Sequence, residues 1–166
     1  MKTAEYWINT LDLEHHPEGG YFREVYQSSE SIPADVLPER YTGQRAYSTS
    51  IYFLLKQGEP SCMHRIQSDE IWHFYAGAGT TLHLIHSDGT YNVMKLGAEP
   101  DRDQHFQHIV PASTWFSAEV TAPGEFSLMG CTVAPGFEFQ DFELGRKEQM
   151  MDEFPQYRDL FNRMCV

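Results

Sequence analysis

The residues of this chain best suited to chemistry are His64 and Glu70, in the stretch from Gly58 to Gly77. Residues 61–65 and 70–76 are predicted to form two strands joined by a turn at residues 67–69. A carboxylate on one such strand can face an imidazole on the other. A histidine beside a carboxylate in a pocket is a credible proton-transfer pair, because its pKa can be tuned near neutrality. We therefore expect His64 and Glu70 to be catalytic.

Alternation along these strands predicts that aromatic side chains surround His64 and Glu70. If Glu70 points inward, Trp72 and Phe74 point inward as well, and His73 faces outward. Further along the chain, Trp115 and Phe116 supply two more large rings. These four rings either line a ligand cavity or fill the interior, and small barrels are usually filled by side chains.

The same alternation gives expectations for two neighbours of His64. Arg65 should face away from it and pair with an acidic residue, whereas Cys62 should share its face. A thiol beside a histidine can be a nucleophile, although a buried structural thiol is the more common outcome.

Other elements are predicted to surround the pair. Residues 21–26 alternate as a strand with Phe22 and Glu24 on one face, and residues 45–55 form a strand rich in β-branched and aromatic residues, with Tyr52 placed inward. We expect Glu24 and Tyr52 to converge with the pair among the rings. His15 and His16 are interpreted as loop residues.

The remaining pattern predicts an all-β, single-domain jelly roll over residues 1–166, with short helices at both ends. Thr3 can cap a helix over residues 3–13, and helical periodicity returns over 146–153 and again after Pro155. Strands are expected at 80–86, 91–96, 107–110 and 126–133, the first two joined by the Asp88-Gly89 turn. Residues 28–43 read as a polar surface excursion.

Composition excludes several function classes. The formal net charge of −12 argues against a nucleic-acid partner and against an anionic membrane surface. The N-terminal residues lack the apolar core of a signal peptide or membrane anchor. The three cysteines have no CxxC pair, which fits reduced thiols, so a cytoplasmic location is expected.

The stretch from Gly58 to Gly77 resembles the first signature of the cupin superfamily, G-x5-H-x-H-x3–4-E-x6-G, except that Ile66 stands where the second histidine belongs. The second signature retains only its proline, Pro111, with Phe116 in place of the ligand histidine. Two ligands of the usual metal centre are therefore replaced by apolar residues. We expect no cofactor, with His64 and Glu70 as the fallback ligands of a metal.

The run GGYFREVY resembles the R-G-x-F-x-E segment of dTDP-sugar epimerases, with Gly19 replacing the arginine while Gly20, Phe22 and Glu24 match. In those cupins this strand helps to bind substrate. The phrases EGGYFREVY, STSIYFLL, HRIQSDEIWHFYAG, VPASTWFSAE and APGFEFQDFEL together are similar to the uncharacterised Cupin-5 family, over nearly the whole chain. The resemblance implies a double-stranded β-helix that is usually a homodimer.

The leading hypothesis is a metal-independent cupin that binds a small polar organic ligand, a sugar or sugar nucleotide, and isomerises or epimerises it. In it His64 removes a proton, Glu70 orients His64 or carries the countercharge, and the ligand contacts Phe22, Glu24, Tyr52, Trp72, Phe74, Trp115 and Phe116. A nucleotide diphosphate would need Arg23, Arg45 or Arg65 in the cavity. Two alternatives stay open: a metal-dependent oxygenase or isomerase using His64, Glu70 and Cys62, and a non-catalytic ligand-binding cupin.

Overall fold

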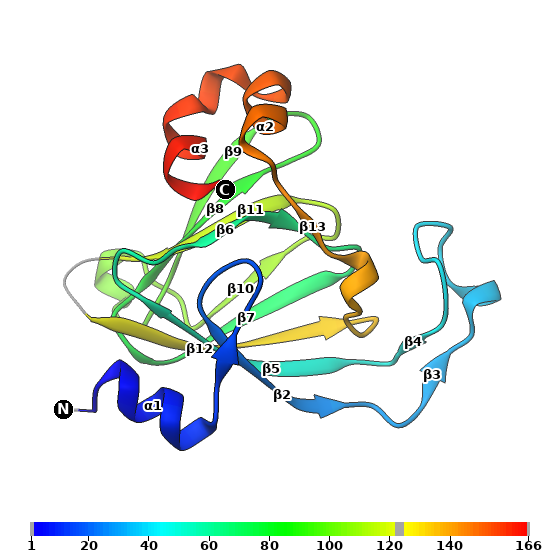
Figure 1. Ribbon diagram of the computed structural model, residues 1–166, viewed down its shortest axis with the longest axis horizontal. Coiled ribbons are helices and arrows are strands. Elements are labelled where there is room, and N and C mark those ends of the chain that lie inside the picture. Colours follow the sequence, from blue (N-terminus) through cyan, green and yellow to red (C-terminus); the bar gives the residue numbers. More distant parts are fainter. Residues whose placement is uncertain (1, 122–124, 166) are drawn as a thin grey trace.

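The computed structural model describes residues 2–121 and 125–165 and shows two antiparallel sheets (Figure 1). The larger sheet has six strands in the order β1-β2-β5-β12-β7-β10. Their bounds are β1 Glu14–His15, β2 Tyr21–Gln27, β5 Thr49–Lys56, β7 Asp69–Gly77, β10 Gln107–Val110 and β12 Phe126–Ala134.

The second sheet has five strands in the order β13-β6-β11-β8-β9. These are β6 Ser61–Arg65, β8 Thr80–Ile85, β9 Tyr91–Leu96, β11 Trp115–Val120 and β13 Glu143–Leu144. The two sheets face each other, and their inner faces meet in the main core, which includes Phe53, Trp72, Leu84, Phe116 and Met129. Two facing antiparallel sheets with these crossing connections confirm the predicted jelly roll.

The polar excursion after β2 forms an arm that stands away from the sheets (Figure 1). It contains β3 Ser31–Ile32, the 3-10 turn η1 Ala34–Val36 and β4 Arg45–Ala46, and β3 pairs with β4. Residues 45–55, predicted as one strand, are divided between β4 and β5. Arg45 therefore belongs to the arm.

Short helices at the two ends pack on the outer faces of the sheets. Helix α1 Ala4–Leu11 is capped by Thr3, whose Oγ1 accepts a hydrogen bond from the Tyr6 amide at 3.2 Å, as predicted. It covers Leu54 and Leu128 from outside the larger sheet. Helices α2 Lys147–Glu153 and α3 Arg158–Met164, joined by η4 Pro155–Tyr157, pack on residues of β6, β8 and β11. Within the described ranges, no helix has the length and apolarity needed to cross a bilayer.

One irregularity in β6 positions the site described below. Phe116 of β11 lies opposite His64, whereas Ala118, two residues further, lies opposite Ser61, three residues back. Strand β6 therefore carries one extra residue, a β-bulge. Because of it Ser61 and His64 both point inward, while Met63 packs outward beneath α2 and α3.

Candidate functional site

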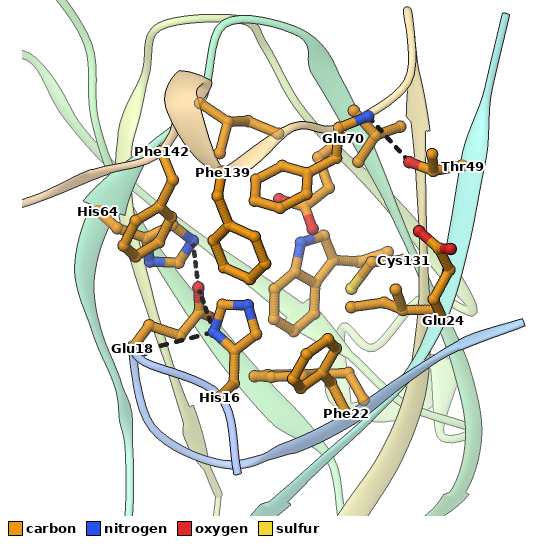
Figure 2. A pocket seen from close by; sticks show the side chains of 16 residues that line it. His16, Glu18, Phe22, Glu24, Thr49, His64, Glu70, Cys131, Phe139 and Phe142 are labelled. Atoms are coloured by element: carbon orange, nitrogen blue, oxygen red, sulfur yellow. Dashed lines mark hydrogen bonds and ion pairs between the residues drawn. The ribbon is translucent and has the colours of Figure 1, made fainter. Parts of the chain in front are cut away.

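A cavity of about 80 Å³ lies between the two sheets (Figure 2). This volume is several times the space that one water molecule needs, so it can hold a small molecule. Its walls come from both sheets, from the loop before β2, and from the segment that contains the 3-10 turn η3 Phe139–Asp141. The lining residues are His16, Glu18, Phe22, Glu24, Thr49, Ile51, Phe53, His64, Ile66, Glu70, Trp72, Cys131, Val133, Phe137, Phe139 and Phe142.

A buried carboxyl group, Glu18, joins two histidines on one side of this cavity (Figure 2). Its Oε2 lies 3.1 Å from Nε2 of His64 and 3.4 Å from Nδ1 of His16. Its Oε1 accepts a hydrogen bond from the Ser61 hydroxyl at 2.8 Å. Glu18 is only 6% exposed. Because of the bulge in β6, Ser61 and His64 can both form hydrogen bonds with this carboxyl group.

The loop that carries Glu18 has one strict backbone requirement. Gly19 has φ of 108°, and a Cβ there would lie 2.5 Å from the carbonyl oxygen of Pro60, so no other residue fits without a shift. The Glu18 carbonyl oxygen accepts a hydrogen bond from the Cys62 amide at 2.7 Å. This bond ties the loop to β6 and fixes Glu18 beside His64.

Hydrogen bonding and burial together place the proton of this pair. Nδ1 of His64 lies 2.7 Å from the carbonyl oxygen of Cys62, and because a carbonyl only accepts, Nδ1 carries a hydrogen. Burial lowers the pKa of His64 to about 3, so its Nε2 is unprotonated at neutral pH. Burial, and then the charge of Glu70, raise the pKa of Glu18 well above its ordinary value. The Glu18 carboxyl therefore holds a proton and donates it to Nε2 of His64.

Glu70 provides a second titratable group in the same cavity. Burial raises its pKa to about 7, and its neighbours Cys131 and Trp72 oppose that shift only in part. The indole nitrogen of Trp72 is buried and lies outside hydrogen-bonding geometry for any described partner. Glu70 is 8% exposed and forms no ion pair with a described lysine or arginine. It therefore sits near its titration midpoint at neutral pH.

The structure brings together five of the residues predicted for the site and leaves four outside the cavity. His64, Glu70, Phe22, Glu24 and Trp72 line it. Although His64 and Glu70 share this cavity, the carboxyl group at hydrogen-bonding distance from His64 is that of Glu18. The four residues that do not line it are Tyr52, Phe74, Trp115 and Phe116.

Each of these four departures has a physical reason. In β5 it is Ile51 and Phe53 that face inward, so Tyr52 packs outward with the α1 cluster, and its predicted inward orientation is wrong. Trp115 also faces outward, onto α2 and α3. Phe74 and Phe116 do point inward, but they pack in the main core. The ring of Phe116 packs against the ring of His64, with 4.1 Å between the ring centroids.

Cys62 does not share the face of His64, because it falls at the β6 bulge, where alternation breaks. Glu18, which bonds His64, and Ser61, which donates a hydrogen bond to Glu18, were not expected in the site at all. His16 does lie in a loop, as predicted, but its side chain enters the cavity. The only sequence signal for Glu18 is its position directly before the Gly19-Gly20 pair.

The three arginines that an anionic ligand would need are paired elsewhere. Arg23 lies 2.7 Å from Asp12, and Arg45 is buried in a two-point contact with Asp141. Arg65 lies 2.7 Å from Glu143 and stacks 4.4 Å from the Trp115 ring centre, which confirms its predicted outward pairing. The lining of the cavity contains no lysine or arginine.

The residues present do not fit the metal centre that the cupin signature implies. Ile66 lines the cavity at one ligand position, and Phe116 occupies another in the core. In residues 2–121 and 125–165, no group of three or more histidine, cysteine, aspartate or glutamate side chains is arranged to hold a metal ion. His64 instead bonds the Glu18 carboxyl group, which also lies 3.4 Å from Nδ1 of His16.

Comparison with known proteins agrees with this architecture. A solved hypothetical protein from Leishmania major is 35% identical and superimposes with a TM-score of 0.91 over 99% of both chains. Protein SO0799 from Shewanella oneidensis is 36% identical, with a TM-score of 0.89 over 100% of this chain and 99% of that one. The uncharacterized yeast protein YML079W (Saccharomyces cerevisiae) is 28% identical over 142 residues, which cover 81% of this chain and 71% of that protein.

More distant structures share the fold alone. Oxalate decarboxylase from Bacillus subtilis is 15% identical, with a TM-score of 0.56 over 93% of this chain and 37% of that enzyme. The family model described as Cupin superfamily (DUF985) matches residues 5–145, most of the chain. The chain therefore belongs to the Cupin_5 family of the cupin superfamily.

Proposed function

We propose that this cupin is a metal-independent isomerase or epimerase that transfers a proton on a small polar organic molecule bound in the cavity. The observation that carries the proposal is the hydrogen-bonded Glu18–His64 pair, which faces the same enclosed space as Glu70. Groups that exchange protons with a substrate work best when their pKa values lie near the working pH. Glu70, with a pKa raised to about 7, meets that condition.

The two groups divide the reaction between them. The Glu70 carboxylate accepts a proton from the carbon next to a carbonyl group, and the electron pair of that C–H bond becomes the double bond of an enol. The carbonyl oxygen takes the proton that Glu18 holds in the resting site. Glu70 then returns its proton to the former carbonyl carbon while the Glu18 carboxylate removes the proton of the neighbouring hydroxyl group, which gives an isomer and restores both groups. If the bound enol turns over first, Glu70 returns the proton to the opposite face of the original carbon and Glu18 takes back the proton from the enol oxygen, which gives an epimer.

His64 acts here through Glu18. Its unprotonated Nε2 accepts a hydrogen bond from the Glu18 carboxyl group in the resting site and so keeps that group in a fixed orientation. Phe116 and Phe142, at ring separations of 4.1 and 5.4 Å, hold the imidazole in place. This arrangement modifies the role first expected of His64, with Glu70 as the base that contacts substrate carbon.

The charges of the residues that line the cavity limit the range of substrates that it can bind. The expected sugar nucleotide is not favoured, because its diphosphate would meet the acidic side chains of Glu24 and Glu70 without a lysine or arginine in the lining. A single sugar or a smaller hydroxycarbonyl compound without phosphate fits the cavity and its charge better.

Deuterium incorporation tests the proposal without knowledge of the full reaction. The protein is incubated in D₂O with dihydroxyacetone, hydroxyacetone and aminoacetone, and exchange at the carbon next to the carbonyl is followed by proton NMR. We expect exchange above the buffer rate for at least one compound and its loss in the Glu70→Gln variant. If no compound exchanges faster than in buffer, the proton-transfer proposal is rejected and a non-catalytic binding cupin takes its place.

A further inference from the structure

We infer that the ligand of this cavity carries a positive charge and is a small amine or quaternary ammonium compound. The inference deepens the proposed function, because it concerns the same cavity and names the chemical class that the cavity selects. For the proton-transfer reaction it points to amino-substituted carbonyl compounds as substrates.

The first support is the sign of the charged groups that face the cavity. The acidic side chains of Glu24 and Glu70 line it together with the protonated carboxyl group of Glu18, and no lysine or arginine does. Glu70 lies deep, whereas Glu24 is exposed and therefore lies where the cavity meets solvent. Figure 2 shows Glu24 on the side opposite Glu18, His16 and His64. A ligand entering past Glu24 thus meets carboxyl groups at the mouth, along one wall and at the base.

The second support is the aromatic wall. The lining includes the rings of Phe22, Phe53, Phe137, Phe139, Phe142 and Trp72. The face of an aromatic ring carries negative potential, and rings that surround a cation bind it most strongly when water is excluded. Phe139, from the η3 segment, is 55% exposed even though it is a large apolar residue. A ring held at the mouth in this way is placed to cover a bound ammonium group.

The third support is the unbalanced charge of Glu70. This side chain is more than nine-tenths buried, and the groups that favour its charged form are a thiol and an indole, Cys131 and Trp72, neither of which carries a positive charge. A buried carboxylate without a cation is costly, and the usual remedies are protonation or a partner of opposite charge. A cationic ligand supplies that partner. An anion would add a further like charge, and a neutral ligand would leave the carboxylate uncompensated.

Three compounds of equal shape and different charge test the inference. Choline is compared with dimethylbutanol, in which a carbon atom replaces the quaternary nitrogen, and with dimethylbutanoate, which is an anion. Binding to the full chain is measured by isothermal titration calorimetry at pH 8, where Glu70 is largely ionised. We expect choline to bind at least about tenfold more tightly than the alcohol, and the anion to bind most weakly.

Matched variants locate the effect in the cavity. Glu70→Gln should reduce choline affinity about tenfold or more and leave affinity for dimethylbutanol unchanged, so the alcohol also reports on folding. Phe139→Leu, at an exposed position, should weaken choline more than the alcohol. Glu14→Gln, on the exposed strand β1, should change neither affinity.

Equal affinity for choline and the alcohol, or no choline binding at millimolar concentration, would overturn the inference. So would a choline preference that survives both Glu70→Gln and Phe139→Leu. These outcomes are separate from those of the deuterium experiment. If hydroxyacetone exchanges deuterium but no cation preference is found, the proton-transfer proposal stands and the cationic ligand is rejected. If choline is preferred but no compound exchanges deuterium, the cationic ligand stands and the proton-transfer proposal is rejected.

Discussion

Nε2 of His64 in β6 lies 3.1 Å from Oε2 of Glu18 in the loop before β2, and both side chains are buried. The His64 ring is fixed from behind by the Cys62 carbonyl oxygen, so only Nε2 is free to bond the carboxyl group. The pair is therefore a unit that holds one proton in a defined place.

Because Glu18 and His64 act as one unit, we can predict how variants of either residue change the rate of deuterium exchange. Replacing Glu18 or His64 with glutamine should slow deuterium exchange by about 100-fold or more, because each change removes the proton or its acceptor. The double variant should be little worse than either single variant, since residues that act as a unit are not additive. His73→Gln is the matched control, because His73 bonds Thr132 and Gln107 outside the cavity. Normal exchange in both single variants would contradict the assignment.

The raised pKa of Glu70 predicts a pH-dependent gain of stability in Glu70→Gln. The folded pKa of about 7 lies above the ordinary value of 4.5, so the folded state binds more protons between these values. Its contribution is complete below pH 4.5 and is lost as pH rises through 7. The variant should therefore exceed the wild type by up to about 3 kcal/mol at pH 8 and by little at pH 4.

Urea unfolding at both pH values measures this difference. The pKa values of His16 and His64 are lowered to about 4 and about 3, so these residues change stability with pH in the opposite direction. Comparing variant and wild type at the same pH cancels their effect. If Glu70→Gln raises the free energy of unfolding equally at pH 4 and pH 8, the Glu70 carboxyl group does not titrate near pH 7.

The buried pair of Arg45 and Asp141 anchors the aromatic side of the cavity. Arg45 is fully buried, and it also donates hydrogen bonds of 2.8 Å to the carbonyl oxygens of Gly43 and Gln44. Arg45→Met should lower the free energy of unfolding by about 3–5 kcal/mol, because it leaves Asp141 buried without a partner.

The same variant should also weaken choline binding, since Asp141 ends the turn that presents Phe139. Arg102→Met is the control: Arg102 and Glu99 form an exposed pair, and such pairs contribute about 1 kcal/mol or less. Similar losses of stability in the two variants, measured by urea unfolding, would argue against the anchoring role.

Restoring the missing histidine should create a metal site. Ile66 lines the cavity with His64 and Glu70, so Ile66→His adds a third donor to that pair. We expect the variant to retain zinc or manganese in native mass spectrometry after purification without chelator, and the matched change Ile32→His in the arm to retain none. A stoichiometric metal in the wild type that is lost in His64→Ala would instead favour the metal-dependent alternative.

Much of the fold could be predicted because its signals are local. Strand β10 was expected at its observed residues, the hairpin of β8 and β9 followed from the Asp88-Gly89 turn, and Thr3 capped the first helix as expected. Each of these features depends on neighbouring residues, so a single sequence contains the information.

The cavity was harder to predict because its wall depends on distant contacts. Alternation separates Tyr52 from Ile51 and Phe53, but nothing in the strand itself shows which of the two faces points inward. Strict alternation predicts that Cys62 shares the face of His64, and the bulge interrupts that alternation. Glu18 reaches His64 only because the Gly19 backbone passes close to Pro60, a contact between segments that alternation cannot reveal.

The extra residue in β6 makes the site depend on length as well as on identity. Ser61 and His64 bond the same carboxyl group although two residues separate them, whereas regular pleating would require one or three, because the bulge turns both side chains inward. Deleting one residue between them would remove the bulge, and regular pleating would still place both side chains on the inner face. The residue lost would be either Cys62, whose carbonyl oxygen holds Nδ1 of His64, or Met63, which packs beneath α2 and α3. Both intervening residues therefore have a structural task, and the length of this segment matters to the site as much as its residue types.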